Sequence, residues 1–505
     1  MWPRLPTKSS PRSAVKVAIW HSTADAVDPT RRLCTATPST ALAVEQIAAF
    51  AEQARTDHLS SEIRQLFKRN ILDSLGCALG ALPGKPFAQL RQQFAEYRAE
   101  GSCTLIGGGA TSTDQAALYN SGLVRYVDLL DSYMSPGGLC HPADNFGGVL
   151  AVAESVGASG EDFMLALAVA YEIGARFTAA IPVMGKGFNH ALQLAMSLAA
   201  SSGKLMRLTP REMAHAIAIA AVDNVSLAAV HCEPVSQWKG FSPGITAMRA
   251  VYTTALAKRG FTGPLRLFEG PNGLERMFGQ EIHIDWTNPS LEMIRHTVMK
   301  KYCSLIHGQP VIEAVLDLRR HHDLSADHVA SVACETFQGG FDIAGGGSFG
   351  PKDHPTTKEQ ADYNLKYLIA VALLDGQVGP AQLDEARVNA PDTQALLAKV
   401  RVEPNPRYTQ GYPDHLGCRI AIRTRSGETH VKDQSGYEGG QDQPLTWKRV
   451  VEKFNWLAEP YADAGLREAI IAEVEILDQR PVSALMGLLA RVSPDATFPA
   501  TLRGI

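Results

Sequence analysis

Local cysteine motifs are missing from this chain of 505 residues. Its eight cysteines lie at least 26 residues apart, and no two form a CxxC pair. This spacing argues against a zinc or iron–sulfur site built from neighbouring thiolates. Scattered cysteines are typical of reduced thiols. We therefore expect a cytoplasmic protein that holds no metal.

A charge excess of either sign is also missing. Lys and Arg number 48 against 52 Asp and Glu, which gives a formal net charge of -4 without a polybasic stretch or an acidic tail. Nucleic acid and membrane surfaces are therefore not expected as partners. We find no apolar run of the length that a membrane span requires.

The first 40 residues differ in composition from the rest. They contain six Lys and Arg against only Asp25 and Asp28, with many Ser, Thr and Pro. We interpret residues 1–40 as a disordered tail and leave them out of the fold prediction. The alternative is a mitochondrial transit peptide, which would change the predicted location to mitochondrial.

Helical patterns dominate residues 41–293, which we predict to form a large all-helical domain. Residues 61–82 carry apolar side chains at helical spacing after two serines and end before Pro83-Gly84. Thr209 to Glu212 form a capping box with Pro210 at the first helical position. Further Ala- and Gly-rich helices are predicted at 113–133, 144–157, 161–180, 190–206 and 244–259. Several are apolar nearly all round, which indicates closely packed, buried helices.

The pattern changes near residue 294, and residues 294–440 predict a smaller, inserted α+β lid domain. Period-two alternation predicts strands at 327–336, 398–404 and 417–433, the last being a hairpin that turns at Ser426-Gly427. Helices are predicted at 308–320 and 357–375. Residues 441–505 return to helix and are expected to complete the helical domain, so the fold class is mainly α.

One segment, LVRYVDLLDSYMSPGGLCHPADN at 123–145, suggests chemistry. On a continuous helix Asp128, Asp131 and Ser132 would share one face, and the Pro136-Gly137-Gly138 turn would bring His141 beside it. Acids next to an imidazole are suited to proton transfer. The structural alternative is a polar helix end followed by a loop histidine. The apolar neighbours favour function, because a carboxylate among them needs a partner.

Other polar residues stand in apolar surroundings and could bind an anion. His190 opens a helix, Lys239 precedes a glycine in QWKGFSPG, and VMKKYCSLIHGQ carries Lys300, Lys301 and His307. Tyr367 lies in the predicted helix YNLKYLIAVALLDG. Each has an ordinary explanation as a helix cap, a snorkelling lysine or a core tyrosine. Together they are what a small substrate with two or three carboxylates would need.

Several segments, taken in order, resemble the MmgE/PrpD family, which includes 2-methylcitrate dehydratase and cis-aconitate decarboxylase. They are VRYVDLLDSYMSPGGLCHPADNFGGVLAVAE, GKGFNHALQLAMSLAASSGKLMRLT, SQWKGFSP, MKKYCSLIHGQPVIEAV, HPTTKEQADYNLKYLIAVALLDG and TWKRVVEKF. The resemblance implies a helical domain with an inserted lid, an active site in the cleft between them, a homodimer, and no cofactor. It also implies a site that contains Asp128, Ser132, His141, His190, Lys239, Lys300 and Tyr367.

The sequence departs from the family pattern at four places. Ser132 stands where Thr is usual, and Asn189 where dehydratase-like members often have Asp. Cys303 takes the position where Pro commonly follows the Lys-x-Tyr element, and Cys140 replaces the usual small residue before His141. These departures concern the identity of the substrate more than the chemistry.

The resemblance favours a hydro-lyase that dehydrates 2-methylcitrate or a closely related hydroxy-tricarboxylate to its cis-aconitate-type product. Such a reaction needs a base, an acid and cations that stabilise the enediolate-like charge. We predict proton transfer by His141, with Asp128 orienting or charging it, carboxylate binding by Lys239 and Lys300, and assistance to the leaving group from Tyr367 or His190. The roles of His141 and His190 could be exchanged. A cis-aconitate-type decarboxylase, an isomerase and a non-catalytic helical scaffold remain the alternatives.

Overall fold

The computed structural model describes residues 41–136, 138–497 and 504. The chain from Ala41 onward forms one compact unit. The predictions made for residues 1–40 and for Gly137 of the turn lie outside the described residues. The division into domains at 293/294 and 440/441 stays a prediction, because all the elements below belong to this one unit.

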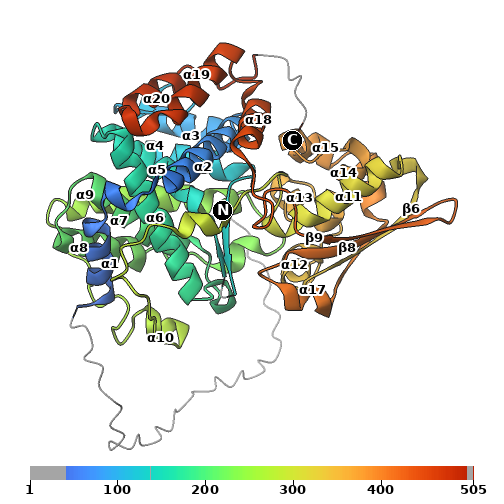
Figure 1. The fold of residues 1–505 in the computed structure, drawn as a ribbon, viewed down its shortest axis with the longest axis horizontal. Coiled ribbons are helices and arrows are strands. Elements are labelled where there is room, and N and C mark those ends of the chain that lie inside the picture. The colour runs from blue at the N-terminus through green and yellow to red at the C-terminus, as the bar shows by residue number, and fades with distance from the viewer. Residues whose placement is uncertain (1–40, 137, 498–503, 505) are drawn as a thin grey trace, which may run out of the picture. The chain divides into compact units, whose positions relative to one another are not determined.

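The unit is mainly helical, as predicted. Its first part contains α1 (Ala43–Gln53), α2 (Ser61–Gly80), α3 (Lys85–Glu96), α4 (Thr113–Tyr126), α5 (Phe146–Ser155), α6 (Gly160–Ala180), α7 (Ala191–Leu205), α8 (Pro210–Val222), α9 (Trp238–Ala257) and α10 (Leu274–Phe278) (Figure 1). The capping box before α8 is confirmed, since Thr209 and Glu212 bond each other's backbone amides.

Small residues let these helices approach closely. A Cβ added at Gly147 of α5 would lie 2.2 Å from the backbone nitrogen of Ser121 in α4. The expectation of tightly packed, buried helices is therefore confirmed. One expectation needs correction, because α6 is long and apolar enough to cross a membrane by length and composition. Its most apolar window is 83% buried within the fold, as in the core helix of a globular domain.

The predicted helix at 113–133 is wrong beyond its first 14 residues. Helix α4 ends at Tyr126, and Asp128 has a φ of +50°, which a right-handed helix cannot continue. Strand β3 (Ser132–Ser135) follows and pairs with β4 (Gly138–Cys140) and β5 (Thr297–Val298). The ion pairs of the Asp128 side chain, described below, stabilise this unusual backbone conformation.

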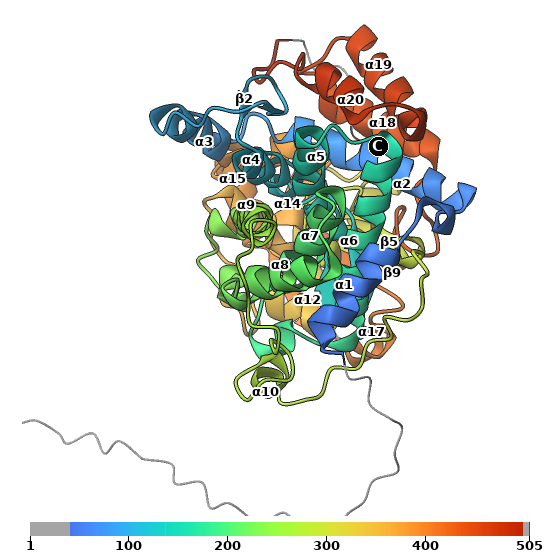
Figure 2. The same cartoon turned by 90° about the vertical axis from the view of Figure 1, so that its left-hand side faces the viewer.

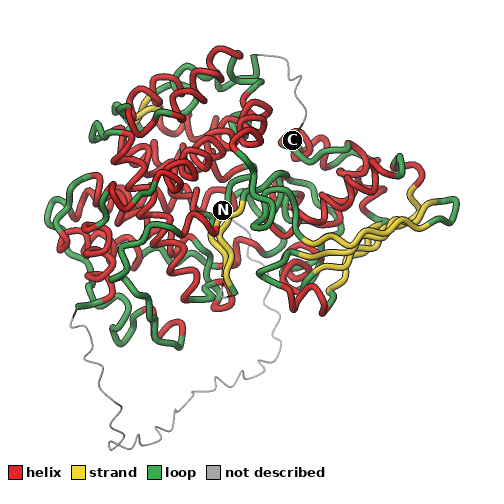
Figure 3. Tube along the Cα trace, viewed as in Figure 1, coloured by secondary structure: helices red, strands yellow, loops and turns green. Residues whose placement is uncertain are grey.

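The strands of the predicted α+β part form a mixed sheet, drawn in yellow in Figure 3. It has four strands in the order β7-β6-β8-β9. Strands β6 (Val329–Thr336) and β7 (Val400–Pro404) are parallel, whereas β8 (Gly417–Thr424) is antiparallel to β6 and to β9 (Thr429–Ser435). The hairpin prediction is confirmed, and Gly427 supplies the left-handed turn residue with φ +96°. A separate two-stranded sheet pairs β1 (Cys103–Thr104) with β2 (Ala110–Thr111).

The helices of this part are α11 (Gln309–His321), α12 (Gln338–Gly340), α13 (Lys358–Ala361), α14 (Leu365–Asp375), α15 (Glu385–Val388), α16 (Pro391–Leu397) and α17 (Pro406–Gly411). Among them, α11, α14 and α17 pack against strands of the sheet. The helix predicted at 357–375 is therefore two helices, with Asn364 capping the second by accepting from the amide of Tyr367 at 3.0 Å.

The chain then returns to the N-terminal helices. Helix α18 (Trp447–Ala458) packs along α2, α19 (Ala464–Glu475) lies at α2 and α18, and α20 (Val482–Leu489) contacts α5 and α19 (Figures 1 and 2). A Cβ at Gly80 of α2 would meet Leu457 of α18 at 2.9 Å, so these two helices are also closely packed.

Candidate active site

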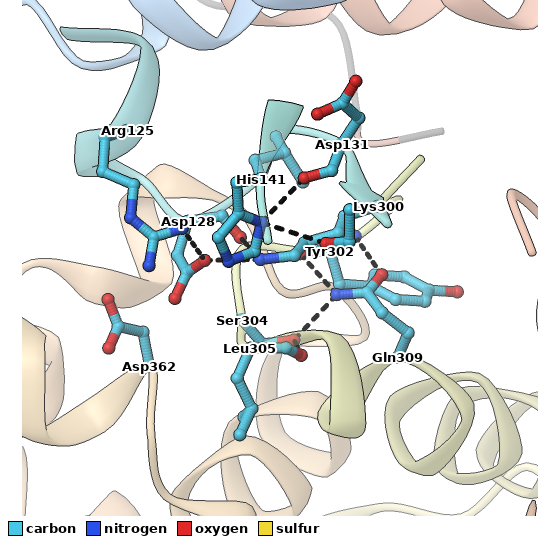
Figure 4. A network of polar contacts seen from close by, with 12 residues as sticks. Arg125, Asp128, Asp131, His141, Lys300, Tyr302, Ser304, Leu305, Gln309 and Asp362 are labelled. Atoms are coloured by element: carbon cyan, nitrogen blue, oxygen red, sulfur yellow. Dashed lines mark hydrogen bonds and ion pairs between the residues drawn. The ribbon is translucent and has the colours of Figure 1, made fainter. Parts of the chain in front are cut away.

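Asp128 lies among three cations that come from separate parts of the sequence. Arg125 Nη1 lies 3.3 Å from its Oδ1 and Lys239 Nζ lies 3.4 Å from its Oδ2. Lys300 Nζ contacts Oδ1 and donates to the Asp128 carbonyl at 3.1 Å (Figure 4). Burial would raise the pKa of Asp128, but Lys300, Arg125 and Lys239 together hold it well below its usual range. Asp128 is therefore a carboxylate at neutral pH.

Asp362 continues this network of charges. Lys239 Nζ lies 2.5 Å from its Oδ1, and Lys358 Nζ lies 3.0 Å from its Oδ2. Lys239 also lies over the ring of Tyr363, 3.8 Å from the centroid. Burial lowers the pKa of Lys239, while Asp362 and Asp128 oppose that shift. Two buried carboxylates thus hold the lysines that the sequence predicted for carboxylate binding.

His141 is oriented by main chain and by a hydroxyl. Its Nδ1 lies 2.7 Å from the carbonyl oxygen of Asp131 (Figure 4). It also lies 3.1 Å from Ser132 Oγ. A carbonyl can only accept, so Nδ1 carries the proton and Nε2 carries the lone pair. Burial, with Arg125 and Lys300 nearby, lowers the pKa of His141 well below its usual value. The result is a neutral imidazole whose Nε2 can accept a proton.

Asp131 holds the backbone that orients His141. Its Oδ1 accepts from the amide of Ala143 at 2.9 Å, and its Oδ2 accepts from Tyr171 at 2.8 Å and from Asn70 at 2.9 Å. Burial raises the pKa of Asp131 to about 6, against the effect of these hydrogen bonds. The structure therefore gives Asp131, rather than Asp128, the contacts that orient the imidazole.

His190 lies beside His141. The two ring centroids are 5.1 Å apart with the edge of one ring directed at the other. His190 Nε2 lies 3.2 Å from Asp144 Oδ2, while its buried Nδ1 has no hydrogen-bond partner within the described part of the chain. Burial lowers the pKa of His190, and Asp144 opposes this shift. A carboxylate partner favours the protonated form of an imidazole, so His190 is better suited than His141 to hold a proton.

A small cavity of about 80 Å³ adjoins these groups. Its wall includes His141 and Lys300 together with Tyr363, His307 and Tyr412. Burial lowers the pKa of His307 to about 4, so this side chain is neutral as well. The lining comes from β4, from the segment Lys300 to His307 and from loops that include Tyr363 and Tyr412.

Of the predicted residues, His141, Lys300 and His307 line this cavity, and Asp128, Ser132, His190 and Lys239 lie in the polar network behind it. The remaining two predicted residues have other partners. Lys301 points to Glu438, with Nζ 2.8 Å from Oε2. Tyr367 is buried in α14, where its hydroxyl donates to the carbonyl of Gln382. Tyr363, which lies between α13 and α14, lines the cavity together with Tyr412.

Sequence reasoning also missed several residues of the network: Arg125, Asp144, His231, Asp362 and Tyr363. Arg125 lies three residues before Asp128, a spacing that could have indicated the ion pair. Asp362 and Tyr363 are adjacent within the segment that had been selected for Tyr367. His231 stacks on Tyr363 with the ring planes 2° apart and bonds Asn189 at 3.0 Å. No local pattern marks His231.

Among residues 41–136 and 138–497, no group of three or more His, Cys, Asp or Glu side chains is placed to hold a metal ion. The seven cysteines of the described part are free thiols. Cys140, next to His141, is buried, and burial raises the pKa of its thiol to about 12. That thiol is therefore not a nucleophile at neutral pH.

Neutral imidazoles beside buried cations define a site suited to anionic substrates and proton transfer. Two models of one protein family match most of this chain. The N-terminal domain of the MmgE/PrpD family matches residues 45–287, and its C-terminal domain matches residues 302–479. The chain belongs to the MmgE/PrpD family, which confirms the resemblance seen in the sequence.

Relatives with two different names match the chain at similar identity. A cis-aconitate decarboxylase-like protein of Aspergillus oryzae is 24% identical, with 88% of this chain and 96% of the relative covered. The cis-aconitate decarboxylase of Mus musculus is 25% identical, with 88% and 93% covered. The 2-methylcitrate dehydratase of Cupriavidus necator is 24% identical, with 70% and 75% covered. Identity alone does not separate the two reactions.

Proposed function

We propose that this protein is a hydro-lyase that dehydrates 2-methylcitrate or a closely related hydroxy-tricarboxylate to its cis-aconitate-type product. The observation that carries the proposal is the pair of buried imidazoles, His141 and His190, beside the cations that surround Asp128. Dehydration needs a base and an acid in one place, and two imidazoles with different partners supply both.

In the proposed reaction His141 Nε2 removes the proton α to a carboxylate. The electron pair of that C–H bond forms the carbon–carbon double bond, and the C–O bond to the hydroxyl breaks. The departing hydroxide takes a proton from His190 and leaves as water. Both imidazoles then return to their starting states by proton exchange with solvent. Asp144, at 3.2 Å from His190 Nε2, favours His190 as the acid.

Lys239, Lys300 and Arg125 would bind the substrate carboxylates. In the described structure they already contact Asp128, so the substrate would share them with this carboxylate. Negative charge that develops next to a carboxylate in the transition state is stabilised most by cations and hydrogen-bond donors whose positions are fixed before the reaction. The buried ion pairs supply that fixed arrangement.

Decarboxylation of a cis-aconitate-type acid is a second candidate. The observation in its favour is that the decarboxylase relatives cover 88% of this chain, against 70% for the dehydratase of Cupriavidus necator. In that reaction a C–C bond breaks, carbon dioxide leaves, and an imidazole protonates the carbon. The same residues would serve, since this reaction also develops negative charge on carbon.

Substrate entry requires a movement in either reaction. The cavity of about 80 Å³ is far below the roughly 300–1,000 Å³ of ordinary ligand sites. A cavity of about 360 Å³ lies next to it, lined by Met134 and Pro413. Met134 is the cross-strand partner of Leu139, and Pro413 follows Tyr412, so chain neighbours line both cavities. Displacement of Leu139 and Tyr412 would join the two spaces.

A substrate panel tests the proposal. Purified protein would be incubated with citrate, 2-methylcitrate and cis-aconitate, with ultraviolet detection of the conjugated double bond and separate detection of carbon dioxide. Dehydration predicts a gain of absorbance from 2-methylcitrate or citrate without carbon dioxide. Release of carbon dioxide from cis-aconitate would establish the second candidate instead. The predicted homodimer can be checked on the same preparation by sedimentation.

A further inference from the structure

Lys453 is a buried lysine of α18 outside the cavity, in the segment TWKRVVEKF that the resemblance had included without a role. Its ammonium has three hydrogens and three partners. Nζ lies 2.6 Å from Asp73 Oδ1 of α2, and it donates to the carbonyls of Leu129 at 3.0 Å and Lys300 at 2.8 Å. Asp73 raises the pKa of Lys453 against the effect of burial, which keeps this lysine charged.

The two carbonyls belong to the segments that carry the site. Leu129 directly follows Asp128, and the second carbonyl is that of Lys300 itself. The Lys300 side chain reaches back to the carbonyl and carboxylate of Asp128. The contacts therefore close a ring: Lys453 joins the two backbones, and the Lys300 side chain joins them again.

We propose that Lys453 is a positioning residue, which fixes the backbone of Lys300 against that of Asp128 and so completes the site from the C-terminal helices. Without it, two buried carbonyls lose a charged donor and Asp73 loses its cation. Both segments then lose the constraint that sets the register of Lys300 and Asp128. This role rests on the proposed function for its kinetic effect, because Lys300 is expected to bind a substrate carboxylate.

Lys68 of α2 provides a matched control. It is buried to a similar extent, its Nζ lies 2.8 Å from Asp478 Oδ1, and it donates to the carbonyl of Glu475 at 2.7 Å. Lys68 thus also ties α2 to the C-terminal helices through one carboxylate and one carbonyl. Its partners are not part of the site. Lys68→Met and Lys453→Met should therefore cost similar stability while differing in their effect on catalysis.

The test compares kcat and KM of Lys453→Met and Lys68→Met with the parent protein, at a temperature where circular dichroism shows both variants folded. We expect Lys453→Met to lose at least about tenfold in kcat and to raise KM for the tricarboxylate, since small displacements of catalytic groups cost up to about 10²-fold. Lys68→Met should stay within about twofold. Equal kinetic parameters for the two variants would overturn the proposal.

If Lys453→Met does not fold, Asp73→Asn keeps an oxygen for Lys453 but removes the charge, and it should show the same effect more weakly. Crystal structures of the Lys453 and Lys68 variants provide a readout that needs no activity. The 3.1 Å contact from Lys300 Nζ to the Asp128 carbonyl should lengthen or break only in the Lys453 variant. An unchanged contact would refute the positioning role, whereas inactivity of the parent on every acid would refute only the proposed function.

Discussion

Replacing His141 by Gln separates proton transfer from hydrogen bonding. The Gln amide can donate to the Asp131 carbonyl that His141 Nδ1 reaches at 2.7 Å, and it can still meet Ser132. Its size is close to that of imidazole, so the cavity wall is kept. The substitution removes only the group that exchanges a proton near neutral pH.

The expected loss follows from the role of a general base. Such groups contribute about 10²- to 10⁴-fold, which corresponds to roughly 3–5 kcal/mol of barrier at 1.36 kcal/mol for each factor of ten. Stability should change little, because one hydrogen bond is exchanged for another and each is worth about 1 kcal/mol. We therefore expect a large fall in kcat together with a shift in melting temperature of no more than about 2–4 °C.

The assay should follow the carbon-bound proton as well as turnover. Wild-type protein in deuterium oxide should exchange the α-proton of the substrate, and His141→Gln should lose exchange and turnover together. His215→Gln is a suitable control, since His215 bonds the backbone of Gly263 away from the cavity. Near wild-type exchange in a folded His141→Gln protein would remove His141 from the mechanism and leave His190 as the base.

Three further predictions use the same assay. Lys239→Met should raise KM by about 10- to 150-fold for a tricarboxylate and less for a dicarboxylate, since a charge-assisted contact is worth about 1.5–3 kcal/mol. An equal increase in KM for both acids would contradict carboxylate binding by Lys239. Tyr367→Phe should lower the free energy of unfolding by about 1 kcal/mol, because the hydrogen bond to Gln382 is lost, and should leave kcat unchanged. Tyr363→Phe at the cavity should change kcat or KM. The reverse pattern would show that Tyr367 is the tyrosine of the site. The pKa of His141 lies well below 6.5 in the folded protein, so kcat/KM should be constant through pH 6.5 and fall only in clearly more acidic buffer. Stability should begin to fall earlier, as the pH drops below about 6.5, because the unfolded chain binds the proton first. An inflection of kcat/KM at or above pH 6.5 would contradict a neutral, buried His141.

Helices and the hairpin followed from local rules. The capping box at Thr209 and the turn at Gly427 need only a few neighbouring residues, and both are confirmed. The helix across Asp128 failed for a different reason. Its apolar periodicity continues to Leu130, but Asp128 has a positive φ, and its carboxylate pairs with Lys239 and Lys300 from distant segments as well as with the nearby Arg125. Contacts of that range leave no periodic signal.

The tyrosine assignment shows the same limit within one short segment. Tyr363 and Tyr367 lie four residues apart, and on a continuous helix they would share a face. The cap at Asn364 breaks that helix, so one tyrosine reaches the cavity while the other is buried against Gln382. The sequence could indicate which segment contributes to the site, but the choice of residue depended on where the helix begins.

The buried charges explain how imidazoles with lowered pKa values could still supply an acid. Ion pairs of up to 4.0 Å link Arg125, Lys239, Lys300 and Lys358 in turn with Asp128, Asp362 and Glu359. Burial, together with the nearby Arg125, lowers the pKa values of His141 and His190 in the empty site. A bound tricarboxylate adds up to three negative charges, so the pKa of His190 should rise when substrate binds. The acidic limb of kcat, which reports the enzyme–substrate complex, should therefore lie at higher pH than that of kcat/KM, which reports the free enzyme. Coincident limbs would mean that the substrate does not bring its charge next to the imidazoles.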